Sequence, residues 1–234
     1  MNRKTIHLDT LKGLPGMYLD LMRQHIELLR SSTFLDRLIY EDTSLASTVE
    51  AINAYCLKNH IKCYHYTRAH AADIETLGLL CRSGDEIREA FLERHSGHFT
   101  DGELSTLQKC WSEYFRGHQK TGRDHRIFFN TTTVALTDGG AQPLFDAYGG
   151  EQIHMPLNGK DHIIRKLGSI GSPLIVVFRA HGSNMTGIGQ EFPWGMTALS
   201  TYHRMHNPEA YTHDVDGYLT EAVAPENILK IHEL

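Results

Sequence analysis

The sequence predicts a mixed α+β fold in which helices come first and strands dominate the second half. In residues 14–30 and 44–60, apolar side chains recur every three or four positions, as on one face of an amphipathic helix. From residue 126 onward, segments rich in aromatic and β-branched residues are interrupted by short helical segments, without the regular alternation of a doubly wound parallel sheet. The patterns GxGxxG and GxxxxGK are absent, which disfavours a Rossmann or P-loop nucleotide site.

Length and composition are those of a folded globular protein. The chain has 234 residues, of which 41% are hydrophobic and 22% charged. We expect an N-terminal helical extension over residues 1–60 and a core over residues 61–234, with a helical insertion near residues 83–120. The net charge of −5 provides no overall attraction to nucleic acid. A local basic groove is compatible with the loop residues Arg116, His118, Lys120, Arg123 and Arg126.

The location predicted from the sequence is the cytoplasm. The longest apolar run, which begins at Pro173, is far shorter than the roughly 18 residues that span a bilayer, and the first ten residues contain no apolar signal core. The cysteines show no CxxC spacing, so we expect buried, reduced thiols rather than a disulfide framework or a zinc knuckle.

The segment from Ile61 to Leu80 is the stretch most typical of a functional site. It predicts a strand over Ile61–Tyr66 and a following helix that carries Ile74 and Leu77 on one face and ends at Gly78. Between them, polar side chains are concentrated at His65, Tyr66, Thr67 and Arg68. A strand that ends in such a polar tip can deliver several side chains to one site.

Two helices are predicted in the insertion. The first begins near Asp85 and places Ile87, Phe91 and Arg94 on one face. The second follows Thr100 and Glu103, whose TxxE spacing is that of a capping box.

The second half is predicted to be mostly strands. A short helix is expected over residues 141–150, because Pro143 suits its start and two glycines its end. Further helices are expected over residues 161–168 and 193–205. Strands are expected over residues 126–136, 151–157, 173–180, 217–223 and 228–234.

Sixteen histidines raise the alternative of a metal-dependent hydrolase. None lies in an HExxH pattern, and the HxxH spacing of His95 and His98 does not put two imidazoles squarely on one face of a helix. The candidate ligands of this alternative are His203, His206, His213 and Asp214.

Three fragments follow one another in a recognisable order: CYHYTR at residues 63–68, TTTVALTDGGAQPLFDAYGG at 131–150, and YLTEAVAPENILKI at 218–231. Together they resemble the ADP-ribosyltransferase superfamily in its HYE arrangement, and the nearest likeness is to bacterial toxin-type members. The resemblance covers the chain from Ile61 to the C-terminus. It implies a split β-sheet core and NAD as the substrate.

The resemblance also implies roles for particular residues. His65 is similar to the residue that orders the adenosine-side ribose of NAD, and Tyr66, Thr67 and Arg68 are further candidates for dinucleotide contact. Tyr148 resembles the aromatic residue that packs on nicotinamide, and Glu221 resembles the catalytic carboxylate. The carboxylates Glu151 and Asp216 remain rivals for that role.

The chemistry explains why these residue types are needed. Breaking the bond between ribose and nicotinamide develops oxocarbenium character, which a fixed carboxylate stabilises, and an aromatic face can hold the nicotinamide ring. No metal is needed. The resemblance implies transfer of ADP-ribose to a macromolecule, protein or nucleic acid, by a toxin or effector that an antitoxin or immunity partner could neutralise. An NAD glycohydrolase with the same site and a binding module without activity are the alternatives.

Overall fold

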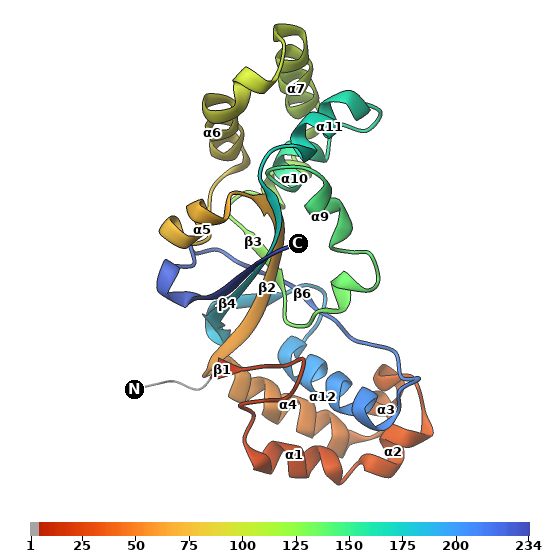
Figure 1. Cartoon of the computed structure of the whole chain (residues 1–234). Helices are drawn as coiled ribbons and strands as arrows, with labels where there is room; N and C mark the ends of the chain where they lie inside the picture. The colour runs from red at the N-terminus through yellow and green to blue at the C-terminus, as the bar shows by residue number, and fades with distance from the viewer. Residues whose placement is uncertain (1–4) are drawn as a thin grey trace. The chain divides into compact units, whose positions relative to one another are not determined.

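The computed structural model describes residues 5–234, which form two compact units (Figure 1). Unit 1 contains the described residues up to Tyr64, together with Phe128–Val134 and Phe178–Tyr218. Unit 2 contains His65–Ile127, Ala135–Val177 and Leu219–Leu234. The chain therefore enters each unit several times.

The fold is mixed α+β, as the sequence predicts, with a largely antiparallel sheet in the order β5-β6-β3-β2-β4-β7. The short β1 pairs with β2 in parallel, and β2 pairs with β3 in antiparallel register, with Tyr64 opposite Asn130. The strands are β1 (Thr5–Ile6), β2 (His60–Ala69), β3 (Ile127–Asn130), β4 (Ser172–His181), β5 (Met185–Gly187), β6 (Asp216–Leu219) and β7 (Ile228–Glu233).

The helices of unit 1 confirm the predicted helical N-terminal part and the helix near residue 193. The segment predicted over 14–30 is divided in two. The helices are α1 (Gly16–Arg23), α2 (Ile26–Ser31), α3 (Leu35–Glu41), α4 (Thr43–Leu57) and α12 (Pro193–His206).

Close packing of α12 on α4 forms the centre of unit 1. Trp194 is fully buried, and its backbone N–H donates to Oδ1 of Asn53 at 3.0 Å. A Cβ atom at Gly195 would lie 2.1 Å from the carbonyl oxygen of Val49, so only glycine allows this approach. The α4 helix is capped by Asp42, which accepts from two backbone N–H groups at 2.9 Å.

Unit 2 contains the predicted helix after β2 and the predicted insertion. The α5 helix ends at Gly78, where φ is +73° and a Cβ atom would lie 1.9 Å from the carbonyl oxygen of Val223. Glycine is therefore required there. The helices are α5 (Ala71–Leu77), α6 (Gly84–His95), α7 (Asp101–Tyr114), α8 (His118–Thr121), α9 (Gln142–Asp146), α10 (Glu151–His154) and α11 (Asp161–Gly168), and the short 3-10 turns η1 (Ser96–His98) and η4 (Pro225–Asn227) complete the unit.

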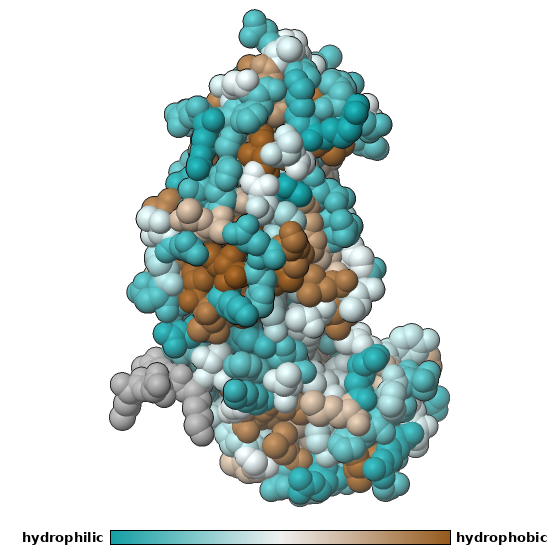
Figure 2. Space-filling model, in the orientation of Figure 1, coloured by the Kyte–Doolittle hydropathy of each residue, from teal (hydrophilic) through white to brown (hydrophobic). Residues whose placement is uncertain are grey.

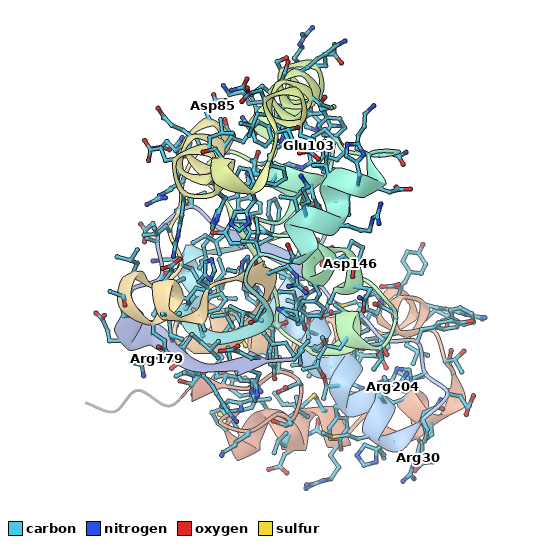
Figure 3. All side chains as sticks on the ribbon, turned by 45° about the horizontal axis from the view of Figure 1, so that its top comes forward. Arg30, Asp85, Glu103, Asp146, Arg179 and Arg204 are labelled. Carbon is cyan, nitrogen blue, oxygen red and sulfur yellow. The ribbon has the colours of Figure 1, made fainter. Side chains whose placement is uncertain are left out.

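Both helices of the insertion begin with a capping box. Thr100 and Glu103 form the predicted one, with the Thr100 N–H donating to the Glu103 carboxylate at 2.8 Å. Ser83 and Glu86 form a second at the start of α6. Glu103, labelled in Figure 3, also accepts from Lys166 of α11 at 2.7 Å. These hydrogen bonds lower the pKa of Glu103 to about 2, with that from Lys166 the largest cause.

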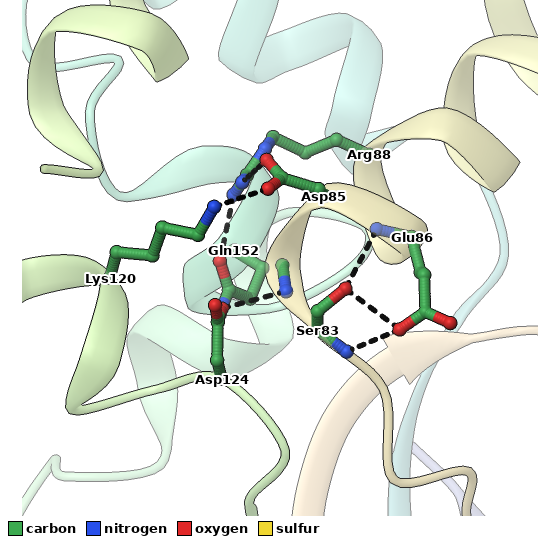
Figure 4. Close-up of polar contacts among 8 residues, drawn as sticks. Ser83, Asp85, Glu86, Arg88, Lys120, Asp124 and Gln152 are labelled. Carbon is green, nitrogen blue, oxygen red and sulfur yellow. Dashed lines mark hydrogen bonds and ion pairs between the residues drawn. The ribbon is translucent and has the colours of Figure 1, made fainter.

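A partly buried polar network joins α6, α8 and α10 (Figure 4). The guanidinium of Arg88, only 7% exposed, donates to Gln152 at 2.8 Å and to Asp85 at 2.7 Å. Lys120 forms an ion pair with the same Asp85. Beside this network, Trp111 donates its indole N–H to the carbonyl of Ile153 at 2.8 Å. The helical cluster is thus tied by hydrogen bonds as well as by its apolar core.

Three strand predictions need correction. The segment 151–157 is not a strand but contains helix α10, because Gly149 and Gly150 adopt positive φ and turn the chain into a helix that buries Ile153. The strand predicted over 126–136 ends at Asn130 and is followed by a 3-10 turn. The strand predicted over 217–223 ends at Leu219, so Glu221 lies in a bend after β6 rather than in a strand.

One edge strand of the sheet carries exposed apolar surface. The β7 strand ends the sheet order, and Figure 2 shows apolar surface in its region, where Leu229 is 44% exposed. In residues 5–234, no helix combines the length and the apolar character that a bilayer span requires.

Candidate functional site

The carboxyl ends of β2 and β6 lie at the same edge of the sheet. The β2–β3 pair is antiparallel. Asn130, at the end of β3, donates to Asp216 at the start of β6 at 2.8 Å, and Phe128 contacts Tyr218 with ring centroids 6.1 Å apart, so β6 runs antiparallel to β3. With β3 between them, β2 and β6 therefore run in the same direction.

The residues that continue to this edge all belong to unit 2. They are the end of β2 from His65, the first residue of β3 and the chain from Leu219. The predicted ribose residue His65 thus lies within the second half of β2, and the predicted carboxylate Glu221 follows β6, which ends at the same edge as β2. The long separation of His65 and Glu221 in the sequence does not indicate that β2 and β6 end at the same edge.

The four polar residues at the end of β2 do not all face one side. Successive side chains of a strand point to opposite faces, so His65 and Thr67 share one face while Tyr66 and Arg68 share the other. His65 and Thr67 are half-buried. The compact polar tip expected from the sequence is therefore divided by the strand itself.

Tyr66 and Arg68 hold helix α9. Tyr66 is 4% exposed and packs edge-to-face on Phe145, with ring centroids 5.9 Å apart. Arg68 donates from Nε to the carbonyl of Phe145 at 2.6 Å and from Nη1 to the carbonyl of Gly171 at 2.8 Å. Tyr66 therefore packs on a side chain of α9, and Arg68 donates hydrogen bonds to backbone carbonyls of the same chain.

Tyr148 lies beside the end of β2. The backbone N–H of Gly149 donates to the carbonyl of Arg68 at 3.1 Å, and this bond holds the preceding Tyr148 next to the strand. The ring of Tyr148 is half-buried and stands edge-on to His95, with centroids 4.6 Å apart and planes at 69°. Burial raises the pKa of the Tyr148 phenol.

Glu221 is exposed in the bend after β6. The bend is anchored two residues later, where Val223 and Leu79 exchange backbone hydrogen bonds of 2.9 Å. The half-buried thiol of Cys81 has a raised pKa, first because of burial and then because of the Glu221 carboxylate. Cys81 is thus an electrostatic neighbour of Glu221, which no pattern in the sequence indicated.

The two rival carboxylates have other partners. Glu151 forms an ion pair with Arg123 at 3.0 Å, which neutralises it at the start of α10. Asp216 belongs to unit 1 and accepts the hydrogen bond from Asn130 described above. Of the three, Glu221 is the one that follows a strand end at the edge reached by His65.

The alternative metal site does not form. His203 is fully buried and its Nε2 lies 2.8 Å and 2.9 Å from the carbonyl oxygens of Leu29 and Ser32. His206 packs on Tyr202, and His213 contacts Asp36 instead. Among residues 5–234, no group of three or more His, Cys, Asp or Glu side chains is arranged to hold a metal ion.

Two side chains of the predicted basic groove pair with carboxylates. Lys120 pairs with Asp85 and Arg123 with Glu151, while Nε of Arg116 donates to a backbone carbonyl at 2.6 Å. These contacts hold the loop to its own unit, and the ion pairs reduce the charge that Lys120 and Arg123 present to solvent.

Sequence reasoning missed a cluster of rings around Tyr148. The rings of His70, Phe91 and His95 all lie within 6 Å of it, at centroid distances of 5.8, 5.9 and 4.6 Å. The sequence drew attention to His95 only through its spacing from His98, as a metal pair. The cluster is assembled from three separate segments, and a helical period links only Phe91 and His95 on α6.

The chain was compared with protein-family models, with curated proteins and with solved structures, and none of the three comparisons gave a match.

Proposed function

We propose that this protein is an NAD-dependent ADP-ribosyltransferase of the HYE type, which cleaves the bond between nicotinamide and ribose and transfers ADP-ribose to a macromolecular acceptor. The observation that carries the proposal is the common edge at which β2 and β6 end. His65 lies in the second half of β2 and Glu221 follows β6, and both belong to unit 2.

In this proposal His65 and Thr67, which share a face of β2, contact the adenosine-side ribose of NAD. Tyr148 packs on nicotinamide. Tyr66 and Arg68 contribute through α9, which they hold in place, so that the chain leaving α9 delivers Tyr148 to the end of β2.

Glu221 is proposed to act in the transition state. Positive charge appears on the ribose as nicotinamide leaves, and a carboxylate held next to it stabilises that charge. Nicotinamide already carries a positive charge in NAD, so it leaves without protonation and one carboxylate is enough. The exposure of Glu221 suits a group that must meet a substrate.

We also propose that the protein acts in the cytoplasm as a toxin or effector, with an antitoxin or immunity partner. Cys56, Cys63, Cys81 and Cys110 are free thiols, which is typical of proteins in a reducing compartment.

The first experiment follows NAD itself. Purified protein is incubated with NAD labelled in the adenosine half and with cell lysate. We expect release of nicotinamide, no effect of chelators, and label on a polymer. Removal of the label by nuclease or by protease then identifies the acceptor, whereas free ADP-ribose without labelled polymer identifies an NAD glycohydrolase.

The second experiment tests the carboxylate. Glu221→Gln keeps the size of the side chain and removes its charge, so turnover should fall by a factor of about 10² to 10³ while NAD affinity, measured by the NAD-induced rise in melting temperature, changes little. Glu151→Gln and Asp216→Asn are the controls. If either control loses turnover while Glu221→Gln retains it, the role moves to that residue, and retention by all three contradicts the mechanism.

A further inference from the structure

We propose that neutral His95 is the positioning residue of Tyr148, and that protonation of His95 releases the Tyr148 ring. This inference rests on the proposed function, in which Tyr148 packs on nicotinamide. It adds a residue and a pH response that neither the sequence motifs nor the resemblance indicated.

The first observation is the geometry of the two rings. The edge-on arrangement of Tyr148 and His95, with centroids 4.6 Å apart, is one of the favoured geometries of aromatic pairs. This is the shortest of the ring contacts that Tyr148 makes within unit 2. His95 therefore fixes the orientation of Tyr148 more directly than its other neighbours do.

The second observation is the way His95 is held. It is the last residue of α6, is only 5% exposed, and packs on Phe91 at a centroid distance of 5.6 Å. Its Nε2 is buried and has no hydrogen-bond partner among the described residues. The His95 ring therefore contacts its neighbours through its faces and edges, and Nε2 takes no part in holding it.

The third observation is the charge around His95. His70 at the start of α5 stacks on it at 5.7 Å and 29°, and His98 of η1 lies 5.9 Å away. Arg94 of α6 and Asp73 of α5 form an ion pair beside it. Burial, followed by His70, Arg94 and His98, lowers the pKa of His95 to about 4, against the opposing effect of Asp73.

A proton on His95 would therefore enter a site without a hydrogen-bond acceptor for Nε2 and beside other basic groups. The structure can relieve that cost by exposing His95 to water, and this movement removes the support of Tyr148. With His95 neutral the ring stays in place. The expected result is an NAD platform that exists at neutral pH and is lost in acid.

The experiment reads the environment of Tyr148 without NAD. A 3-fluorotyrosine is placed at position 148, and its ¹⁹F resonance is followed by NMR in the wild type and in His95→Phe, His95→Leu and His98→Ala. His95→Phe keeps a ring, His95→Leu fills the space without one, and His98→Ala removes an exposed histidine that contacts His95. We expect a changed or broadened resonance in His95→Leu only.

The same samples are titrated with acid. The wild-type resonance should move with a midpoint of about 4, the pKa of His95, and the resonance of His95→Phe should not move in that range. A resonance that moves equally in both proteins would overturn the pH response. An unchanged resonance in His95→Leu at neutral pH would overturn the positioning role.

Kinetics separate this inference from the proposed function. The KM for NAD should rise up to about tenfold in His95→Leu, the size of one aromatic pair, with a smaller change in kcat and with KM restored in His95→Phe. Loss of turnover in Tyr148→Ala together with an unchanged KM in His95→Leu would overturn the inference alone. A wild-type protein without NAD turnover would overturn the proposed function, and the ¹⁹F measurements would then decide the positioning of Tyr148.

Discussion

The two units each bury a histidine, and the two histidines are used differently. In unit 1, His203 is fully buried and its Nε2 lies within hydrogen-bond distance of two carbonyl oxygens. Carbonyls only accept, so Nε2 of His203 carries a proton and donates. In unit 2, Nε2 of His95 has no partner among the described residues, and ring contacts hold the side chain.

The difference separates a side chain used for folding from one used to orient a neighbour. His203 joins α12 to the end of α2 through hydrogen bonds from Nε2. Each ring keeps one buried nitrogen without a hydrogen-bond partner among the described residues, Nδ1 of His203 and Nε2 of His95, but His95 is held by ring contacts in the cluster around Tyr148. Burial of a histidine alone therefore does not indicate a function, whereas the identity of its partners does.

The largest effect expected from this comparison is that of His203→Ala. It leaves a cavity and deprives the Leu29 carbonyl of its donor, while the Ser32 carbonyl keeps Asn207 as a donor at 2.9 Å. We expect the free energy of unfolding to fall by about 3 kcal/mol, measured by urea denaturation. His206→Ala, at a half-buried neighbour on the same helix, is the control. A loss below about 1 kcal/mol would show that these hydrogen bonds do not hold α12.

The substitution His95→Phe is expected to raise the free energy of unfolding, whereas His203→Ala lowers it. Phenylalanine keeps an aromatic ring and removes the unsatisfied nitrogen, so the free energy of unfolding at pH 7 should rise by about 1 kcal/mol. The measurement is again urea denaturation. Destabilisation of similar size would mean that Nε2 has a partner in solution, and the contrast between the two histidines would disappear.

The third prediction concerns pH. Folding lowers the pKa of His95 from 6.5 to about 4, so the unfolded chain takes up a proton more readily than the folded one. This histidine therefore contributes stability that is complete above pH 6.5 and is lost as the pH falls toward 4. The stability of the wild type relative to His95→Phe should decrease across that window. A constant difference between the two proteins would contradict the lowered pKa.

An effect of about the same size as that of His95→Phe is expected at the start of the helix that carries His95. Ser83→Ala removes the capping box of α6 and should lower the free energy of unfolding by about 1 kcal/mol. Ser112→Ala, an exposed serine within α7, is the matched control. Equal effects of the two substitutions in thermal unfolding would indicate that α6 is held by its packing and not by its cap.

Local chemistry in the sequence was enough to predict many elements of the fold. The helix after β2 ends at Gly78 as predicted, because its positive φ and close approach to Val223 both require glycine. The capping box of Thr100 and Glu103 forms where its spacing indicates. The continuous apolar run after Pro173 is a strand, and the α+β class follows from the same patterns.

Local patterns failed where contacts from distant segments decide the structure. Residues 151–157 have a strand-like composition, but two positive-φ glycines and burial of Ile153 under Trp111 make the segment helical. The polar tip of β2 also looked like one site. The alternation of the strand and the carbonyls that Arg68 reaches, 77 and 103 residues further on, divide it.

The sequence by itself selected the residues of the candidate site, because His65, Tyr148 and Glu221 belong to short motifs in a recognisable order. Only the tertiary structure decided that β2 and β6 end at one edge and that His95 stands against Tyr148. Strand order and ring contacts depend on pairing across long separations in the chain, and no local periodicity records such pairing.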